Sequence, residues 1–331
     1  MLFAVCGVAL AASPEPFPVL RGDYLGQPLP GEQPQLFAPG IVCTGMYERD
    51  VAVTPDGSEV FFGLIQGQAV TIMHSSRVDG VWTEPRIAPF ASDPRFYCLE
   101  PCVRPDGRRV FFLSTRPPGD APVLPGWAYQ DIWYSDRQPD GSWGPPVNLG
   151  PPVNTEDGEF FPSVTRDGTL YFTRETAETE ESSIWRSRLV DGAYAEPEKL
   201  ADPVNRTSTY NACIAPDESY LLACVRSKEQ KTPTYVVFFR SPEGQWSEPV
   251  DPGDLVNSSK VGAISPSISP DGRYFFFASA AAAEPDSVPY GTMTVQRFLA
   301  RHTRPRNGSS DIYWAAASVL ERLRERAFPA K

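Results

Sequence analysis

The strongest constraint on the fold is one short phrase that occurs five times along the chain. Each copy consists of a short run ending in β-branched residues, a tight turn that begins with aspartate, and a second apolar run. An Asp-Gly pair between such runs is a strong signal for a β-hairpin. The turn residues are Asp56 and Gly57, Asp106 and Gly107, Asp167 and Gly168, Asp217, and Asp271 and Gly272. Five copies indicate a repeat protein.

The spacing of the copies suits the blade of a β-propeller. The turn aspartates are separated by 50, 61, 50 and 54 residues. A third run, rich in aromatic and β-branched residues as strands are, follows each hairpin. In four units, a second turn with an aromatic residue and a proline then leads to a fourth strand. Proline donates no ladder hydrogen bond and therefore belongs on an edge strand. Each unit is thus an antiparallel four-stranded blade with its last strand outermost.

The fifth unit lacks its own fourth strand, because a run with helical spacing follows residues 311–316. Residues 34–40 resemble the fourth strands of other units, so they are expected to pair there and close the ring. We predict an all-β fold, a five-bladed β-propeller with an N-terminal closing strand; six blades are the alternative. The expected segments are a signal peptide over 1–12, an extended arm over 13–33, the propeller over 34–317 and a short helical tail over 318–331.

The repeated phrase and the aromatic-proline turn resemble the WD40-like propeller repeats of the TolB type, which occur in periplasmic and secreted bacterial proteins. The resemblance covers roughly residues 34–317 and implies the fold and a periplasmic or extracellular location. TolB has six such units and a separate N-terminal domain, whereas this chain shows five units. A TolB role in an envelope complex is therefore not implied, and the family's signature residues imply no reaction.

Composition limits the partners. The formal net charge of −11 disfavours nucleic acid and anionic membrane surfaces. The apolar run over residues 1–12 is too short to cross a bilayer and resembles the hydrophobic half of a secretory signal peptide. No membrane span is expected in the mature chain, which we expect to be a monomer.

The innermost strands supply the candidate binding residues. The residue four positions before each turn aspartate is small in every unit, as expected where strands crowd near the axis. By the strand period of two, the residues six and eight positions before the aspartate should share that face. The predicted lining of the channel mouth is Glu48, Asp50, Glu100, Glu159, Thr209 and Asn211.

Three interpretations of these carboxylates remain open. They are solvated groups in a polar channel, they bind a ligand or a cation such as Ca²⁺ at Glu48, Glu100 and Glu159, or they supply the acid and base of a glycosidase. Other chemistry is sparse, since His74 and His302 are the only histidines. We predict a binding or scaffold module for a protein or glycan ligand, with no catalytic residue identified. A carbohydrate-active enzyme that uses the channel carboxylates is the alternative.

Loops and cysteines give secondary predictions. The longest insertion, residues 280–310, is a candidate lid and carries Tyr290, Arg301, His302 and Arg304. The six cysteines are expected to form few or no disulfides, and Cys43 with Cys98 is the least implausible bridge. Trp82, Trp143 and Trp246 recur at blade spacing, which favours core packing over sugar binding.

Overall fold

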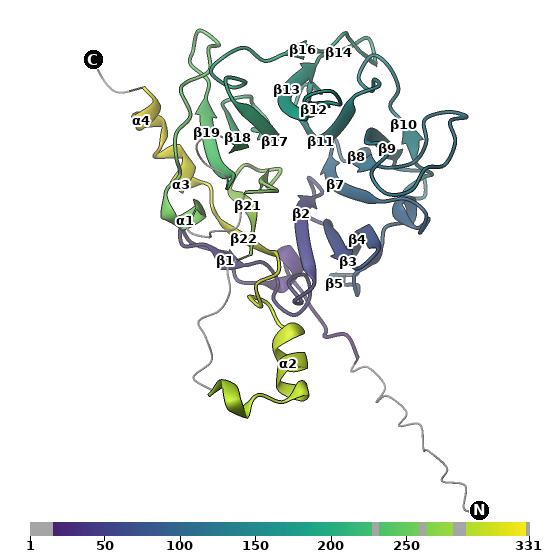
Figure 1. Ribbon diagram of the computed structural model, residues 1–331, viewed down its shortest axis with the longest axis vertical. Helices are drawn as coiled ribbons and strands as arrows, with labels where there is room; N and C mark the ends of the chain where they lie inside the picture. The colour runs from purple at the N-terminus through teal and green to yellow at the C-terminus, as the bar shows by residue number, and fades with distance from the viewer. Residues whose placement is uncertain (1–15, 227–231, 258–262, 281–288, 329–331) are drawn as a thin grey trace, which may run out of the picture.

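A computed structural model of the chain describes residues 16–226, 232–257, 263–280 and 289–328. Five antiparallel sheets stand around a common axis, with the innermost strands β2, β7, β11 and β17 facing the centre (Figure 1). The predicted five-bladed β-propeller is confirmed. The predicted signal peptide over 1–12 lies outside the described residues. Within the described part of the chain, no helix is long and apolar enough to span a membrane.

Each blade follows the expected order of strands from the axis outward. Blade one contains β2 (Tyr47–Val53), β3 (Glu59–Gln66), β4 (Ala69–Val78) and β6 (Arg86–Ile87). Blade two contains β7 (Cys98–Val103), β8 (Arg109–Ser114), β9 (Asp131–Asp136) and β10 (Val147–Asn148). Blade three contains β11 (Gly158–Val164), β12 (Leu170–Thr176), β13 (Glu181–Ser187) and β16 (Glu198–Lys199).

The last two blades depart slightly from this pattern. Blade four contains β17 (Ser208–Ile214), β18 (Tyr220–Arg226) and β19 (Thr234–Phe239), and Val250 takes the fourth position through two 2.9 Å hydrogen bonds with Val237. Blade five contains β20 (Ser267–Ile268), β21 (Tyr274–Ser279), β22 (Asp311–Ala316) and the N-terminal β1 (Gln35–Leu36). The remaining elements are β5 (Val81–Trp82), β14 (Leu189–Val190), β15 (Ala193–Tyr194), η1 (Tyr24–Gly26), η2 (Pro89–Ala91), η3 (Tyr290–Thr292), α1 (Asp254–Asn257), α2 (Val295–His302), α3 (Ser318–Glu321) and α4 (Arg324–Ala327).

The repeated turns have one geometry. In each, the aspartate Oδ1 accepts a hydrogen bond of 3.0–3.1 Å from the backbone N–H two residues later. This side-chain bond closes a tight turn locally. Four of the turns place glycine at positive φ after the aspartate, whereas Glu218 adopts φ 58° in the fourth. The five aspartates are therefore structural.

The N-terminal strand closes the ring, as predicted. Gln35 and Leu36 pair with Trp314 and Tyr313 of β22. Directly after them, the fully buried Phe37 packs edge-on against Phe276 and Trp314, with ring centroids 5.2 and 5.3 Å apart. Segments from the two ends of the chain therefore share one hydrophobic core.

The aromatic residues of the second turns also have structural roles. Trp82 and Trp143 are buried, and their indole nitrogens donate to the Gly22 carbonyl at 2.7 Å and to Glu59 Oε2 at 3.3 Å. Trp246 is half-buried against the core of blade four. The expected core packing is confirmed for Trp82 and Trp143.

The antiparallel order gives the ring two different faces. The five aspartate turns join first and second strands, and we call their side the turn face. Connections between second and third strands emerge on the opposite side, the loop face, because strand direction alternates within a blade. Residues 115–130 and the described residues of segment 280–310 belong to the connections of the loop face. A ligand therefore meets different residues at the two ends of the axis.

We expect Phe37→Ala to destabilise the whole propeller by about 3 to 5 kcal/mol, because it leaves a cavity in the core that joins the chain ends. Leu29→Ala, at a side chain that is 53% exposed, should change stability by less than about 0.5 kcal/mol. Urea unfolding measures both. A loss below about 1 kcal/mol for Phe37→Ala would contradict the role of the closing strand.

Candidate functional site

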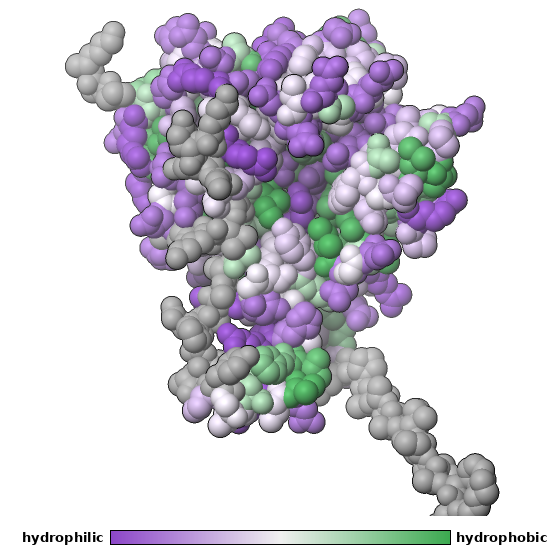
Figure 2. All heavy atoms as spheres, viewed as in Figure 1, coloured by the Kyte–Doolittle hydropathy of each residue, from purple (hydrophilic) through white to green (hydrophobic). Residues whose placement is uncertain are grey.

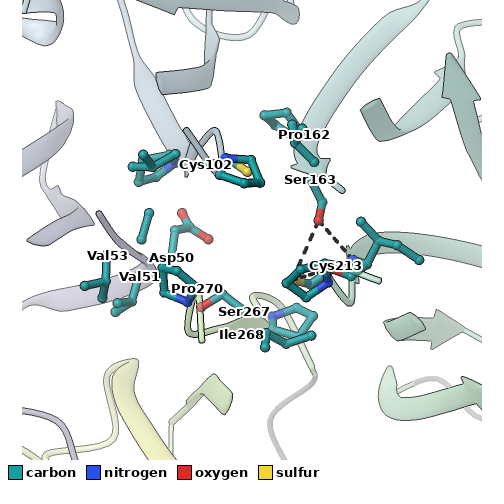
Figure 3. Close-up of a pocket in the computed structure, with 18 of the residues that line it drawn as sticks. Asp50, Val51, Val53, Cys102, Pro162, Ser163, Cys213, Ser267, Ile268 and Pro270 are labelled. Atoms are coloured by element: carbon teal, nitrogen blue, oxygen red, sulfur yellow. Dashed lines mark hydrogen bonds between the residues drawn. The ribbon is translucent and has the colours of Figure 1, made fainter. Parts of the chain in front are cut away.

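A cavity of about 320 Å³ lies on the axis between the innermost strands of all five blades (Figure 3). It reaches the turn face, where the residues that precede the turn aspartates form its rim. Its walls combine valine and isoleucine side chains with two thiols, and its inner end carries two carboxylates. The rim consists of Pro55, Pro105, Arg166, Pro216, Pro270 and Asp271; the walls include Val51, Val53, Val103, Val164, Ile214, Ile268, Cys102 and Cys213.

A bulge in the innermost strand of four blades sets the inner end of this cavity. The residue six positions before the turn aspartate has positive φ in each case, and the pairing with the second strand shifts there. These residues are Asp50 (φ 57°), Glu100 (φ 61°), Phe161 (φ 54°) and Asn211 (φ 47°). A bulge adds one residue to a strand, so the side chains before it exchange faces.

The structure consequently separates the six predicted lining residues. Asp50 and Glu100 line the cavity. Glu48, Glu159 and Thr209 are 0% exposed, and none of them lines it. Asn211 does not line it either, and its side-chain amide donates to the Ile264 carbonyl. The expectation of one funnel lined by all six residues is wrong, because strand alternation does not continue through the bulge.

Arg49 joins the two carboxylates at the inner end. Its Nε donates to Asp50 Oδ2 at 2.7 Å and its Nη2 donates to Glu100 Oε1 at 2.8 Å. Gly63, opposite Arg49 on β3, leaves the space that they need, since a Cβ there would lie 2.8 Å from Asp50 Oδ2. Arg49 was not predicted as a site residue. A glycine inside a strand marks such a close approach and was an available signal.

The bulged residues also bond to one another around the ring. The Glu100 N–H donates to Asp50 Oδ2 at 3.3 Å, and the Phe161 N–H donates to Glu100 Oε2 at 2.8 Å. Both oxygens of Glu100 are therefore occupied. Asp50 Oδ1 is buried and has no hydrogen-bond partner within the described structure. Figure 3 shows the Asp50 side chain pointing into the cavity.

The charges of this cluster do not balance when both carboxylates are ionised, because two negative groups share one guanidinium. Burial raises the pKa of Glu100 above its usual range, the charge of Arg49 opposes that rise, and the charge of Asp50 adds to it. The two carboxylates hold Arg49 charged, against the effect of its own burial, by raising its pKa. A cationic group at Asp50 Oδ1 would complete the cluster.

Two thiols face the cavity from opposite sides of blade three. Cys102 and Cys213 are half-buried, whereas Cys43, Cys98 and Cys224 are buried. Ser163 lies between the two half-buried thiols on the wall and donates to Cys213 Sγ at 3.7 Å. Burial raises the pKa of Cys102 to about 12 and that of Cys213 to about 11. All five described cysteines are free, so Cys43 and Cys98 are not bridged.

Glu48 and Glu159 occupy equivalent positions in blades one and three. Each accepts bonds from the backbone and hydroxyl of the threonine four residues earlier, Thr44 or Thr155. Arg174 of β12 donates to Glu159 at 2.7 Å, whereas the residue opposite Glu48 on β3 is Leu64. Glu48 therefore lacks the compensating charge that Glu159 has, and its Oε2 has no partner within the described structure.

The three carboxylates proposed for Ca²⁺ do not converge. Glu48, Glu100 and Glu159 lie in different blades, and Arg49 and Arg174 pair with the latter two. In the described residues, no group of three or more His, Cys, Asp or Glu side chains is arranged to hold a metal ion. These three positions therefore form no shared cation site.

Neither the described part of the candidate lid nor the two histidines line the cavity. None of the described residues of segment 280–310 lines it, because that segment emerges on the loop face. Arg301, His302 and Arg304 therefore lie outside the site, and so does the backbone of Tyr290. His74 is on β4, stacked on Phe61 at 4.6 Å and 3.5 Å from Glu59 Oε1.

Known proteins resemble this chain in structure rather than in sequence. No family model matches the sequence, and no curated protein does. TolB from Acinetobacter baumannii is similar in structure, with 15% identity and a TM-score of 0.46 over 82% of this chain and 57% of that one. This chain thus spans little more than half the length of that protein.

Two further solved structures are similar. A GH62 hydrolase in complex with xylotriose has 11% identity and a TM-score of 0.46, over 86% of this chain and 94% of that one. Endo-arabinase from Bacteroides thetaiotaomicron VPI-5482 has 15% identity and a TM-score of 0.47, over 78% of this chain and all of that one.

The buried Glu48 leads to a prediction about how protein stability depends on pH. Burial raises its folded-state pKa from 4.5 to about 7. Between pH 4.5 and pH 7, folded Glu48 keeps a proton that it releases in the unfolded chain. The stability gained from binding this proton is therefore complete below about pH 4.5 and is lost as the pH rises through 7. Glu48→Gln should raise the melting temperature at pH 8 and change it little at pH 4.

Glu159→Gln is the matched control, because it leaves Arg174 without its carboxylate. It should lower the melting temperature at pH 8. Thermal unfolding at both pH values measures the pair of variants. Shifts of the same sign at pH 8 would contradict the proposed difference between the two glutamates.

Proposed function

We propose that this propeller is a binding module whose axial cavity receives a lysine side chain of a protein ligand. The observation that carries the proposal is Asp50 Oδ1, a carboxylate oxygen at the inner end of a largely apolar cavity that has no hydrogen-bond partner in the described part of the chain. A buried acceptor without a partner is costly, and a ligand that donates to it recovers that cost. Asp50 is only 4% exposed, so a ligand must enter the cavity to reach it.

The shape and chemistry of the cavity suit an aliphatic chain that ends in an ammonium group. A volume of about 320 Å³ lies at the lower end of the range for small-ligand sites. The valine, isoleucine and proline walls would contact the four methylene groups of lysine. The ammonium would donate to Asp50 Oδ1 and neutralise the excess negative charge beside Arg49.

A glycan ligand has less support. Sugars present many hydroxyl groups, which need several donors and acceptors. Of the hydroxyl groups on the wall, Ser163 already donates to Cys213 and accepts from the Ile214 N–H, and Ser267 Oγ has no partner among the described residues. Asp50 and Ser267 would have to satisfy most of the sugar's polar groups.

Glycoside hydrolysis is the second candidate, because Glu100 has a raised pKa, as general acids of glycosidases do. That chemistry needs two carboxylates that both reach the scissile bond. Both oxygens of Glu100 already accept hydrogen bonds, from Arg49 and Phe161. The geometry therefore supports binding better than hydrolysis.

We place the protein in the periplasm or outside the cell, on the strength of the apolar run over residues 1–12 and the TolB-type repeats. The cavity opens on the turn face, and no described residue of segments 115–130 and 280–310 lines it. A protein ligand would therefore dock against the five hairpins and insert one side chain along the axis.

Two amino acids with blocked backbone termini test the proposal. Nα-acetyl-lysine amide and Nα-acetyl-norleucine amide have the same four-carbon side-chain stem, and only the lysine derivative carries a side-chain ammonium group. The lysine derivative should raise the melting temperature of the wild-type protein more than the norleucine derivative does. Asp50→Asn should remove that difference, whereas Asp131→Asn, a carboxylate outside the cavity, should retain it.

Equal shifts with both compounds, or an undiminished lysine effect in Asp50→Asn, would contradict recognition by Asp50. Chromogenic aryl glycosides test the alternative, glycoside hydrolysis. Turnover that is lost in Glu100→Gln would favour the hydrolase instead.

A further inference from the structure

Helix α2 exposes an apolar surface that the propeller does not cover. Val295, Phe298 and Leu299 are 74, 46 and 56% exposed, and no residue of the helix is buried. Figure 1 shows α2 projecting beyond the ring, and Figure 2 shows a hydrophobic patch on it. At 100° per residue, these three side chains fall on one arc of the helix, and Arg297 and Arg301 fall on the opposite arc.

The surrounding segment is basic, unlike the rest of the chain. Residues 289–310 contain four arginines, at positions 297, 301, 304 and 306, and no aspartate or glutamate. The whole chain has a formal net charge of −11. Positive charge is therefore concentrated around α2 in an otherwise acidic protein.

The helix is capped and attached to the ring, and none of its residues is buried. Thr294 caps it by accepting from the Arg297 N–H at 3.2 Å. At its other end, Asn307 Nδ2 donates to the carbonyls of Gly45 and His302 at 2.7 and 2.6 Å. Gly45 fits closely there, since a Cβ would lie 2.6 Å from the His302 oxygen. These contacts fix the C-terminal end of α2 to the ring and leave its apolar arc outward.

We propose that α2 binds the surface of an anionic lipid membrane. An interfacial helix buries phenylalanine and leucine at the boundary of the acyl chains while arginines on its polar arc contact the headgroups. Anionic headgroups attract the arginines of residues 289–310. The acidic remainder of the protein is repelled by the same surface, so the electrostatics favour an orientation with α2 toward the membrane.

The orientation would have a consequence for the cavity. Helix α2 belongs to the connection between β21 and β22 on the loop face, whereas the axial cavity opens on the turn face. A protein held at a membrane by α2 would leave the cavity mouth open to a soluble partner. The membrane proposal itself does not depend on the identity of the cavity ligand.

Sedimentation with lipid vesicles tests the proposal on the full chain. The wild-type protein should bind vesicles of phosphatidylcholine with 30% phosphatidylglycerol at least about tenfold more tightly than pure phosphatidylcholine. Phe298→Ser/Leu299→Ser and Arg297→Gln/Arg301→Gln should each lose about tenfold in partitioning or more. Val123→Ser/Leu124→Ser, which alters an exposed apolar pair in blade two, should bind as the wild type does. Thermal melting confirms that each variant folds, which is expected because α2 has no buried residue.

Undiminished binding by Phe298→Ser/Leu299→Ser would overturn the proposal, as would the absence of wild-type binding to the anionic vesicles. Light scattering measures the oligomeric state and thereby tests the alternative that a second copy of the chain binds α2. A wild-type dimer that becomes monomeric in Phe298→Ser/Leu299→Ser, with no vesicle binding by either protein, would show that a second copy covers α2 and would also overturn it.

Discussion

The bulge in the innermost strands is the constraint on which the axial site depends. It holds Asp50 and Glu100 at positive φ, a conformation that non-glycine residues rarely adopt. The surrounding bonds maintain it: the Glu100 N–H reaches Asp50, and the Phe161 N–H reaches Glu100. Backbone strain of this kind persists only where neighbours fix it, and it concentrates at functional sites. The same bonds leave one Asp50 oxygen available to a ligand.

The blades could be predicted from the sequence because their signals are local. Each aspartate turn closes by a bond to a backbone N–H two residues away. The closing strand was also predictable, since residues 34–40 share a pattern with the fourth strands that they replace. Here the local signals and the global fold agree, as they do in sequences that specify one structure.

The site could be predicted only in part because the bulge carries no glycine and has no local signature. The small residues that were expected near the axis, four positions before each turn aspartate, do line the cavity, and Cys102 and Cys213 are two of them. Before the bulge, strand alternation assigned Glu48 and Glu159 to the channel, although both are buried elsewhere. The repeated Thr-to-Glu spacing at Thr44 and Thr155 was an available signal that these glutamates bond locally.

Thiol labelling tests the central claim, a ligand-accessible cavity on the axis, most directly. N-ethylmaleimide at pH 9, followed by peptide mapping, should modify Cys102 and Cys213 and leave Cys43, Cys98 and Cys224 unmodified in the folded protein. The rate should rise steeply with pH, because the pKa values of about 12 and 11 keep both thiols largely protonated. Nα-acetyl-lysine amide should slow labelling at these two positions. Labelling spread evenly over these five described cysteines, or rates at Cys102 and Cys213 that do not respond to the compound, would contradict the account.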